Sequence, residues 1–233
     1  MCSAVFRALG CELSIKIAID GPASSGKGTV ARLVARAMSY SYIDTGAMYR
    51  AVALMARRAG VAWEDSEALT ALTVELGFRF TWSGERLITW VNGEDVSLSI
   101  RDPGIGQGAS RVSVHRGVRE ALVEVQRTLA WSGGVVMEGR DIGTVVLPDA
   151  ELKVFLDADV VVRARRRAAE LQSRGEAVSQ EAVEQELRVR DARDRGRKYS
   201  PLKQAGDAVY LDTTAMSPGE AAETIAAWAR QRA

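Results

Sequence analysis

The sequence predicts an α/β fold in which a parallel five-stranded sheet is covered by helices on both faces. Short runs rich in β-branched residues alternate with longer segments of helical periodicity, a pattern typical of parallel sheets. A glycine-rich segment, Gly21–Thr29, joins the first β-rich run to the first helical segment. One stretch near residues 78–97 breaks the alternation and predicts a small antiparallel sheet. A chain of 233 residues can form one domain with an insertion.

The expected strands and helices follow one another regularly along the chain. The strands of the large sheet are expected at Ile15–Asp20, Ser41–Asp44, Val135–Glu138, Leu152–Asp157 and Ala208–Asp212. The helices are expected at Lys27–Met38, Ala47–Ala59, Asp65–Leu76, Arg116–Trp131, Val160–Arg174, Gln180–Arg193 and Pro218–Arg230. Ligands of such sheets bind at the carboxyl ends of the strands, where Asp20, Asp44 and Glu138 fall.

The segment that breaks the alternation is expected to be a β-rich insert. The β-rich runs Phe78–Trp82 and Leu87–Val91 follow each other, and Asn92-Gly93 after them is a strong hairpin signal. We interpret Trp82 and Trp90 as a small core of this insert rather than as a platform for a nucleotide base.

These boundaries give a domain organisation with one interruption. The core is expected to comprise residues 15–62 and 106–233, and the insert residues 63–105. Residues 1–14 are expected to be an N-terminal extension, to which we assign no function.

The segment Gly21–Thr29 has the features of a phosphate-binding loop. It lies between a strand and a helix, and Lys27 follows its second glycine, Gly26, directly. Glycine allows successive N–H groups to converge on one anion, and the helix N-terminus adds partial positive charge. These features predict a P-loop NTPase fold, with an ordinary glycine-rich turn as the alternative. The expected ATP-binding residues are Gly21, Pro22, Ala23, Ser24, Ser25, Gly26, Lys27, Gly28 and Thr29.

This loop departs from the common P-loop at one position. A Ser or Thr usually follows the lysine and ligates Mg²⁺, whereas this chain has Gly28 there and its hydroxyl at Thr29. The sequence Gly-Lys-Gly-Thr resembles that of nucleoside monophosphate kinases. We therefore expect no direct protein ligand for the Mg²⁺ that accompanies ATP. Asp44 or Glu138 is expected to reach the metal through water.

Two further motifs follow the loop in the chain. Asp44–Arg50 reads Asp-Thr-Gly-Ala-Met-Tyr-Arg and opens a helix, for which Thr45 is a candidate N-cap. The segment Glu138–Val146 reads Glu-Gly-Arg-Asp-Ile-Gly-Thr-Val-Val. With Gly-Lys-Gly-Thr, these motifs closely resemble bacterial cytidylate kinases, and the resemblance extends from about Ile15 to the C-terminus. It implies a monomeric enzyme of pyrimidine metabolism that transfers the γ-phosphoryl group of ATP to CMP or dCMP.

The resemblance also implies which residues bind the acceptor nucleotide. Those expected to bind CMP are Thr45, Tyr49, Arg50, Ser110, Arg119, Arg140, Asp141, Arg190, Asp194 and Arg197. The chemistry agrees with the assignment, because Arg119 can donate to the acceptor edge of cytosine and Asp194 can accept from both sugar hydroxyls. Without the resemblance, Arg50 is equally compatible with the exposed face of an amphipathic helix, and for Arg119 a surface position on a helix is favoured.

Two arginine-rich helical segments near the C-terminus resemble the lid of this kinase group, expected at about residues 159–178. Arg163 and Arg167 are i,i+4 neighbours and are expected to share one face. Fixed cations stabilise the charge that develops in phosphoryl transfer. The residues expected to act in catalysis are Lys27, Arg140, Arg163, Arg167 and Arg190.

Composition limits the other classes of function. The formal net charge of +1 gives no field that favours nucleic acid or a membrane, and no apolar run is long enough to span one. Acidic residues are interspersed in the basic segments, which favours salt-bridged helix surface over RNA binding for the remaining arginines. His115 is the only histidine, so a histidine base is not expected. Cys2 and Cys11 have no metal-ligand spacing and suit a reducing cytoplasm.

Three alternatives remain at this stage. The first is another small P-loop kinase that acts on UMP, AMP or a small metabolite. The second is a GTPase-like switch, although the chain lacks an Asn-Lys-x-Asp segment for guanine. The third is an inactive relative, which would be expected to have lost Arg50, Arg140 or Asp141.

Overall fold

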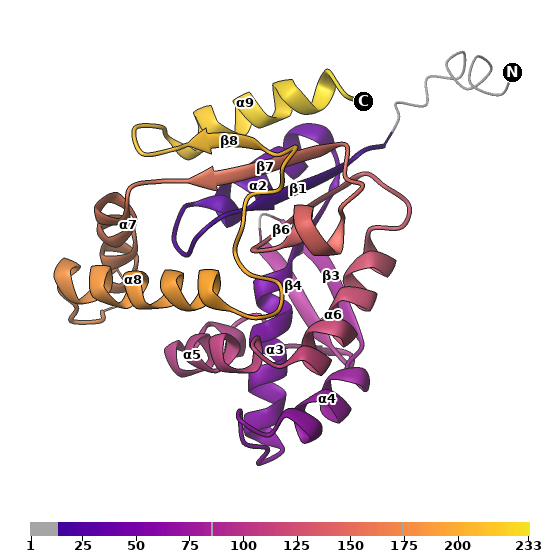
Figure 1. The fold of residues 1–233 in the computed structure, drawn as a ribbon, viewed down its shortest axis with the longest axis vertical. Coiled ribbons are helices and arrows are strands. Elements are labelled where there is room, and N and C mark those ends of the chain that lie inside the picture. The colour runs from indigo at the N-terminus through magenta and orange to yellow at the C-terminus, as the bar shows by residue number, and fades with distance from the viewer. Residues whose placement is uncertain (1–13, 85, 174) are drawn as a thin grey trace, which may run out of the picture.

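A computed structural model describes residues 14–84, 86–173 and 175–233 of the chain. Cys2, Cys11 and nearly all of the predicted N-terminal extension lie outside these ranges. The centre of the molecule is a parallel five-stranded sheet with the strand order β2-β6-β1-β7-β8 (Figure 1). Its strands are β1 (Lys16–Asp20), β2 (Ser41–Asp44), β6 (Val135–Gly139), β7 (Leu152–Asp157) and β8 (Val209–Asp212). The predicted α/β fold is confirmed.

The helices are close to the predicted ones, with one addition. They are α2 (Lys27–Met38), α3 (Thr45–Arg58), α4 (Ser66–Val74), α5 (Pro103–Val112), α6 (Arg116–Leu129), α7 (Val160–Gln172), α8 (Gln180–Gly196) and α9 (Pro218–Arg230). In the described part of the chain, no helix is both long enough and apolar enough to cross a membrane.

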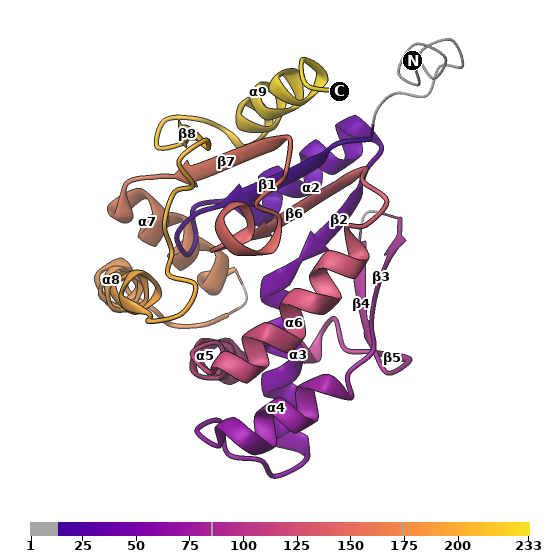
Figure 2. The same ribbon diagram turned by 45° about the vertical axis from the view of Figure 1, so that its right-hand side comes forward.

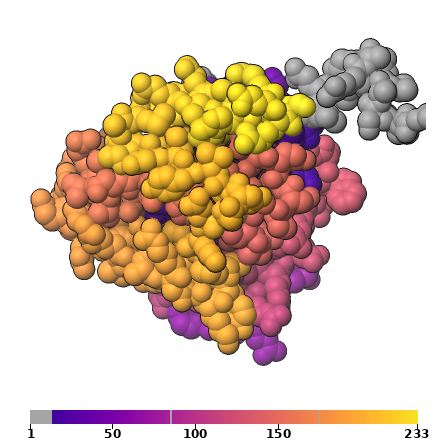
Figure 3. All heavy atoms as spheres, turned by 45° about the horizontal axis from the view of Figure 1, so that its top comes forward, coloured from indigo at the N-terminus to yellow at the C-terminus, as the bar shows by residue number. Residues whose placement is uncertain are grey.

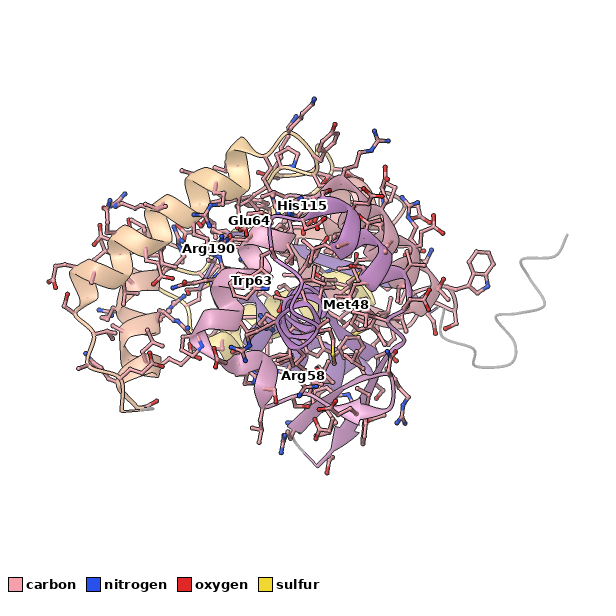
Figure 4. All side chains as sticks on the ribbon, turned by 90° about the horizontal axis from the view of Figure 1, so that it is seen from below. Met48, Arg58, Trp63, Glu64, His115 and Arg190 are labelled. Atoms are coloured by element: carbon pink, nitrogen blue, oxygen red, sulfur yellow. The ribbon has the colours of Figure 1, made fainter. Side chains whose placement is uncertain are left out.

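The strands alternate their side chains between two hydrophobic layers. In β1, Ile17 and Ile19 pack with α2 and α9, whereas Ala18 packs on the other face with α3 and α6. Met48, in the first turn of α3, is fully buried in this second layer (Figure 4). Burial on both faces explains why the strands are continuous apolar runs in the sequence.

The inserted segment forms the expected antiparallel sheet. It consists of β3 (Phe78–Ser83), β4 (Arg86–Val91) and β5 (Glu94–Asp95), and it lies beside the main sheet (Figure 2). The interpretation of its tryptophans as a small core is wrong. Trp82 is 38% exposed, and Trp90 lies beneath the Arg79 guanidinium, 4.8 Å from it. Buried Val91 belongs to the hydrophobic layer of α3 and α6 instead. The division of the chain into core and insert stays a prediction.

Helix α5 was missed because three of its ten residues are glycines, which disfavour helices in isolation. Its start is nevertheless well defined, since Asp102 accepts a hydrogen bond from the Ile105 N–H and Pro103 occupies the first turn. Gly108 is required by packing, because a Cβ there would lie 2.6 Å from the Trp63 ring. Tertiary contact thus stabilises a helix that local preference alone does not predict.

Candidate active site

The predicted phosphate-binding loop connects β1 to α2 at the carboxyl edge of the sheet. Gly26 adopts φ +92° directly before the helix, a conformation that favours glycine. Gly21 packs against the Leu156 carbonyl of β7, and a Cβ at this position would overlap it. The loop therefore lies tightly on the sheet, and Gly21 and Gly26 each have a structural reason.

Lys27 is the first residue of α2 and is buried next to a carboxylate. Its Nζ donates to the Pro22 carbonyl at 3.1 Å and lies 3.8 Å from Glu138 Oε2. Burial, followed by the nearby Arg140 charge, lowers the pKa of Lys27, and burial raises the pKa of Glu138. Negative phosphates at the loop would relieve the cost of burying this ammonium group.

Arg163 ties the loop to helices α7 and α8. Its guanidinium donates to the Ala23 carbonyl at 3.0 Å and to Asp191 Oδ2 at 2.7 Å, while the Ala23 N–H donates to Asp191 Oδ1 at 3.3 Å. Helices α7 and α8 also share an apolar contact with Ala23. The structure therefore places Arg163 on the tip of the loop, where its side chain is buried among protein acceptors.

Their spacing predicts that Arg163 and Arg167 share one face of the helix, but the two side chains have different surroundings. A cavity of about 320 Å³ lies beside the loop between α7 and the segment before α9, and Arg166 and Arg167 line it, whereas Arg163 does not. Arg167 pairs with Glu170 at 2.8 Å. Figure 3 shows this face, with early-chain atoms visible between the orange and yellow segments.

A cluster of arginines gathers beside the loop from α3, α6, the C-terminal part of α8 and the end of β6. Among the described residues, four arginines of this cluster each have one buried guanidinium nitrogen without a hydrogen-bond partner. These are Arg50 Nε, Arg119 Nε, Arg190 Nε and Arg197 Nη2. Buried donors without partners are rare in proteins and cost free energy, so each one indicates a missing acceptor.

The positive charges of this cluster act on one another. Burial and then the Arg140 charge lower the pKa of Arg190 to about 10, so Arg190 remains protonated at neutral pH. Arg140 and Arg190 both also lower the pKa of Lys27, which places the cluster beside the loop. Arg190 lies on the side of α8 that faces the rest of the molecule (Figure 4). Bound anions would offset this repulsion.

Carboxylates hold the arginines in place. Arg50 pairs with Asp44 at 2.8 Å, and Arg140 pairs with Asp194 at 2.9 Å. Arg119 Nη2 donates to Asp141 at 2.6 Å. In the described ranges of the chain, Arg50 Nε and Arg119 Nε remain without a hydrogen-bond partner beside these pairs.

Asp20, at the end of β1, orients the segment that carries two of these residues. Its carboxylate accepts hydrogen bonds from the Ile142 and Gly143 N–H groups at 2.8 and 2.7 Å. These residues begin a π-helical turn (Ile142–Val146) directly after Arg140 and Asp141. Burial raises the pKa of Asp20 to about 7, although both N–H groups oppose the shift.

Three predicted acceptor-site residues have different surroundings from those expected. The Thr45 hydroxyl donates to the Glu138 carbonyl at 2.7 Å, and Asp44, not Thr45, caps α3 by accepting from the Ala47 N–H at 2.8 Å. Asp44 rather than Thr45 is the N-cap because its extended backbone places its carboxylate over the first turn of α3. Ser110 Oγ accepts from Arg193 at 2.8 Å, and the Tyr49 ring lies 5.3 Å from the Arg119 guanidinium.

Several residues of the site were not predicted from the sequence. Arg166, Asp191 and Arg193 lie in a segment with many charges, and only the contacts in the fold distinguish them from solvated surface. Tyr42 was missed because a strand tyrosine is an ordinary core residue. Its hydroxyl donates to Glu138.

The fold and the site together define a P-loop nucleotide-binding protein with a cluster of buried arginines beside the loop. The family model for cytidylate kinase matches residues 17–231. The chain is 46% identical over 221 residues to a cytidylate kinase of Geobacter sp. (strain M21), and the match covers 95% of both chains. It is 49% identical to one of Bacillus licheniformis, covering 92% and 95% of the two chains. It is 47% identical to one of Streptococcus pneumoniae, covering 94% and 99%. The chain belongs to the cytidylate kinase family.

The carboxylate that pairs with Arg140 gives a pH-dependent prediction. Burial alone would raise the pKa of Asp194, but the charges of Arg140, Arg197 and Arg190 outweigh it and hold the pKa below its ordinary value. Ionised Asp194 therefore stabilises the fold above the unfolded-state pKa of about 3.9, and this contribution is lost as the pH falls through the folded-state pKa. We expect the difference in unfolding free energy between wild type and Asp194→Asn to be constant above about pH 5 and to shrink below pH 4.

Denaturant titrations between pH 3 and pH 7 measure this difference. Substitution of the exposed Glu223→Gln controls for the loss of one negative charge. A difference that does not change with pH would contradict the pairing of Asp194 with these arginines.

Proposed function

We propose that the protein transfers the γ-phosphoryl group of ATP to CMP and dCMP. The observation that supports this most strongly is the set of unpartnered buried guanidinium nitrogens of Arg50, Arg119, Arg190 and Arg197 beside Lys27. A protein that binds one nucleotide has no use for a second cluster of cations opposite its P-loop. Family membership supports CMP as the acceptor.

In this proposal, the loop and Lys27 bind the donor phosphates, and Arg50 and Arg140 bind the acceptor phosphate. Arg190 is assigned to the space between the two anions, because its charge lowers the pKa of Lys27 and the charge of Arg140, after burial, lowers the pKa of Arg190 itself. An acceptor oxygen attacks the γ-phosphorus in line, and ADP leaves. No covalent intermediate and no protein base is needed, because the phosphate of CMP is already anionic at neutral pH. Positioning and electrostatic stabilisation therefore account for the rate.

Residues near Lys27 suit the Mg²⁺ ion that accompanies ATP. The buried Glu138 carboxylate lies where a side chain at position 28 would otherwise be, since a Cβ there would be 2.9 Å from Glu138 Oε1. Asp44 is the second carboxylate at this edge, but it already pairs with Arg50. We assign Glu138, acting through water, to the metal. When bound, the ion neutralises charge on the β- and γ-phosphate oxygens.

The proposed cytosine site lies between α5 and α6. Arg119 is held by Asp141 and by the Ser113 carbonyl, which leaves its Nε to donate to the acceptor edge of the base. Ser110 accepts from Arg193, so its hydroxyl proton is available to the ligand. Asp194, fixed by Arg140, is assigned to the sugar hydroxyls. One copy of the chain supplies all of these groups, and we propose a monomer that acts in the cytoplasm.

Lid closure completes the proposed site. Arg166 and Arg167 of α7 line the cavity beside the loop, where they face the donor nucleotide. Movement of α7 and α8 would pull on the loop directly, because Arg163 and Asp191 bind Ala23. Exclusion of water on closure suppresses hydrolysis of ATP.

The assignment of the loop is tested by Lys27→Met. Loss of this charge is expected to lower kcat/KM for CMP-dependent formation of ADP by about 10²-fold or more, because the lysine stabilises charge on the transferred group. The assay offers CMP, dCMP, UMP and AMP in turn, and wild type is expected to use CMP and dCMP. Lys16→Met, on the adjoining strand and paired with Asp149, is the control. Near-normal turnover by Lys27→Met would remove the loop from the mechanism.

The base site is tested by Arg119→Ala. The variant is expected to lose about 10-fold or more of the preference for CMP over UMP, because the cytosine edge loses a donor built to pair with it. Arg116→Ala, an exposed position on the same helix that pairs with Glu120, is the control. A thermal unfolding curve establishes that each variant is folded. An unchanged preference in folded Arg119→Ala would show that Arg119 does not read the base.

A further inference from the structure

Tyr42 is a buried polar residue that the proposed mechanism does not use. It lies on the edge strand β2, and only 4% of its surface is exposed. Its hydroxyl donates to Glu138 Oε1 at 3.2 Å. Burial, and then the Glu138 charge, raises the pKa of this hydroxyl well above its ordinary value, so Tyr42 remains a hydrogen-bond donor at neutral pH.

The space that Glu138 occupies exists because residue 28 is a glycine. A Cβ at Gly28 would lie 2.9 Å from Glu138 Oε1 and 3.6 Å from the Tyr42 hydroxyl. A Ser or Thr at this position, as in the common P-loop, would displace the carboxylate. In this chain, a carboxylate held by a tyrosine therefore lies where the common loop carries its metal-binding hydroxyl.

Glu138 also has a competing partner. Its Oε2 lies 3.8 Å from Lys27 Nζ, which is longer than a direct charge-assisted hydrogen bond. If the carboxylate rotated toward Lys27, the pair would close and the lysine charge would be less available to phosphates. The hydrogen bond from Tyr42 opposes that rotation because it holds the other oxygen.

The inserted sheet supports Tyr42 from the opposite side. The Trp82 ring of β3 lies 6.2 Å from the Tyr42 ring, with the two planes tilted by 34°. The Arg36 guanidinium of α2 lies 5.7 Å from the same Trp82 ring. The partly exposed tryptophan thus packs on the side chain that holds Glu138. These contacts connect β3 to the phosphate-binding loop through side chains alone.

We propose that Tyr42 is a positioning residue, whose hydroxyl keeps the Glu138 carboxylate in the space left by Gly28 and directed to the metal–nucleotide complex. The inference rests on the proposed function, because it concerns the donor half of the same site. Tyr42 itself touches neither substrate. Its effect is on the gain in nucleotide affinity that Mg²⁺ produces.

Tyr42→Phe tests the proposal, because it keeps the ring that packs on Trp82 and removes only the hydroxyl. Calorimetry measures the affinity for an ATP analogue with a non-hydrolysable β,γ-bridge, with and without Mg²⁺. We expect Mg²⁺ to tighten binding about tenfold less in the variant than in wild type, the scale of a hydrogen bond to a charged group. In turnover assays, KM for Mg·ATP rises more than kcat falls, and KM for CMP does not change.

Tyr40→Phe is the matched control. Tyr40 lies two residues earlier, and its oxygen accepts from the Ile15 N–H at 3.3 Å, away from Glu138. A double-mutant cycle adds a second readout that separates positioning from general damage. If Tyr42 acts through Glu138, Tyr42→Phe has no further effect on the Mg²⁺ gain in the Glu138→Gln background.

Two results would overturn the proposal. One is a Mg²⁺ gain in Tyr42→Phe equal to that in Tyr40→Phe. The other is an equal loss of affinity with and without Mg²⁺, which would indicate ordinary structural damage. Failure of the wild-type protein to phosphorylate CMP would instead contradict the proposed function, and the binding measurements would still decide the role of Tyr42.

Discussion

The repulsion among buried cations at the carboxyl edge of the sheet is the constraint on which the rest of the site depends. Burial and then the charge of Arg140 lower the pKa of Lys27 and of Arg190, and the charge of Arg190 also lowers that of Lys27. In the part of the chain that the structure describes, several buried guanidinium nitrogens have no hydrogen-bond partner. The fold tolerates this arrangement because buried carboxylates offset part of the charge and rigid elements hold the remainder. In the proposed function, two anionic ligands would offset the remaining charge.

The supporting contacts show how the sheet directs these charges. Asp20 orients the turn after Arg140 and Asp141 from the end of β1. Arg163 of α7 and Asp191 of α8 form an ion pair, and Asp191 also binds the Ala23 N–H of the loop, so one ion pair connects the loop to both helices. The inserted sheet contributes through Trp82, which packs against the Tyr42 ring beside Glu138.

The sequence was informative where local chemistry is sufficient. The glycines, the lysine and the apolar runs predicted the loop and the parallel sheet, because their requirements are local. Helix α5 could not be predicted in this way, since packing against Trp63 compensates for its glycines. The sequence also could not predict that Arg163 connects the loop to α8, because helical spacing does not reveal which acceptors surround a side chain. The prediction that Trp82 is a core residue of the insert is wrong for the same reason, because the sequence does not reveal that its neighbours are Tyr42 and Arg36.

Binding of a single molecule that carries both nucleotides tests the two-site account most directly. The probe is adenosine joined to cytidine through a chain of five phosphates, measured by calorimetry with CMP and ATP as competitors. The account predicts one molecule bound per chain, much tighter than either nucleotide alone and displaced by both, because the arginine cluster and the loop are occupied together. Binding no tighter than that of ATP, with no competition from CMP, would contradict it.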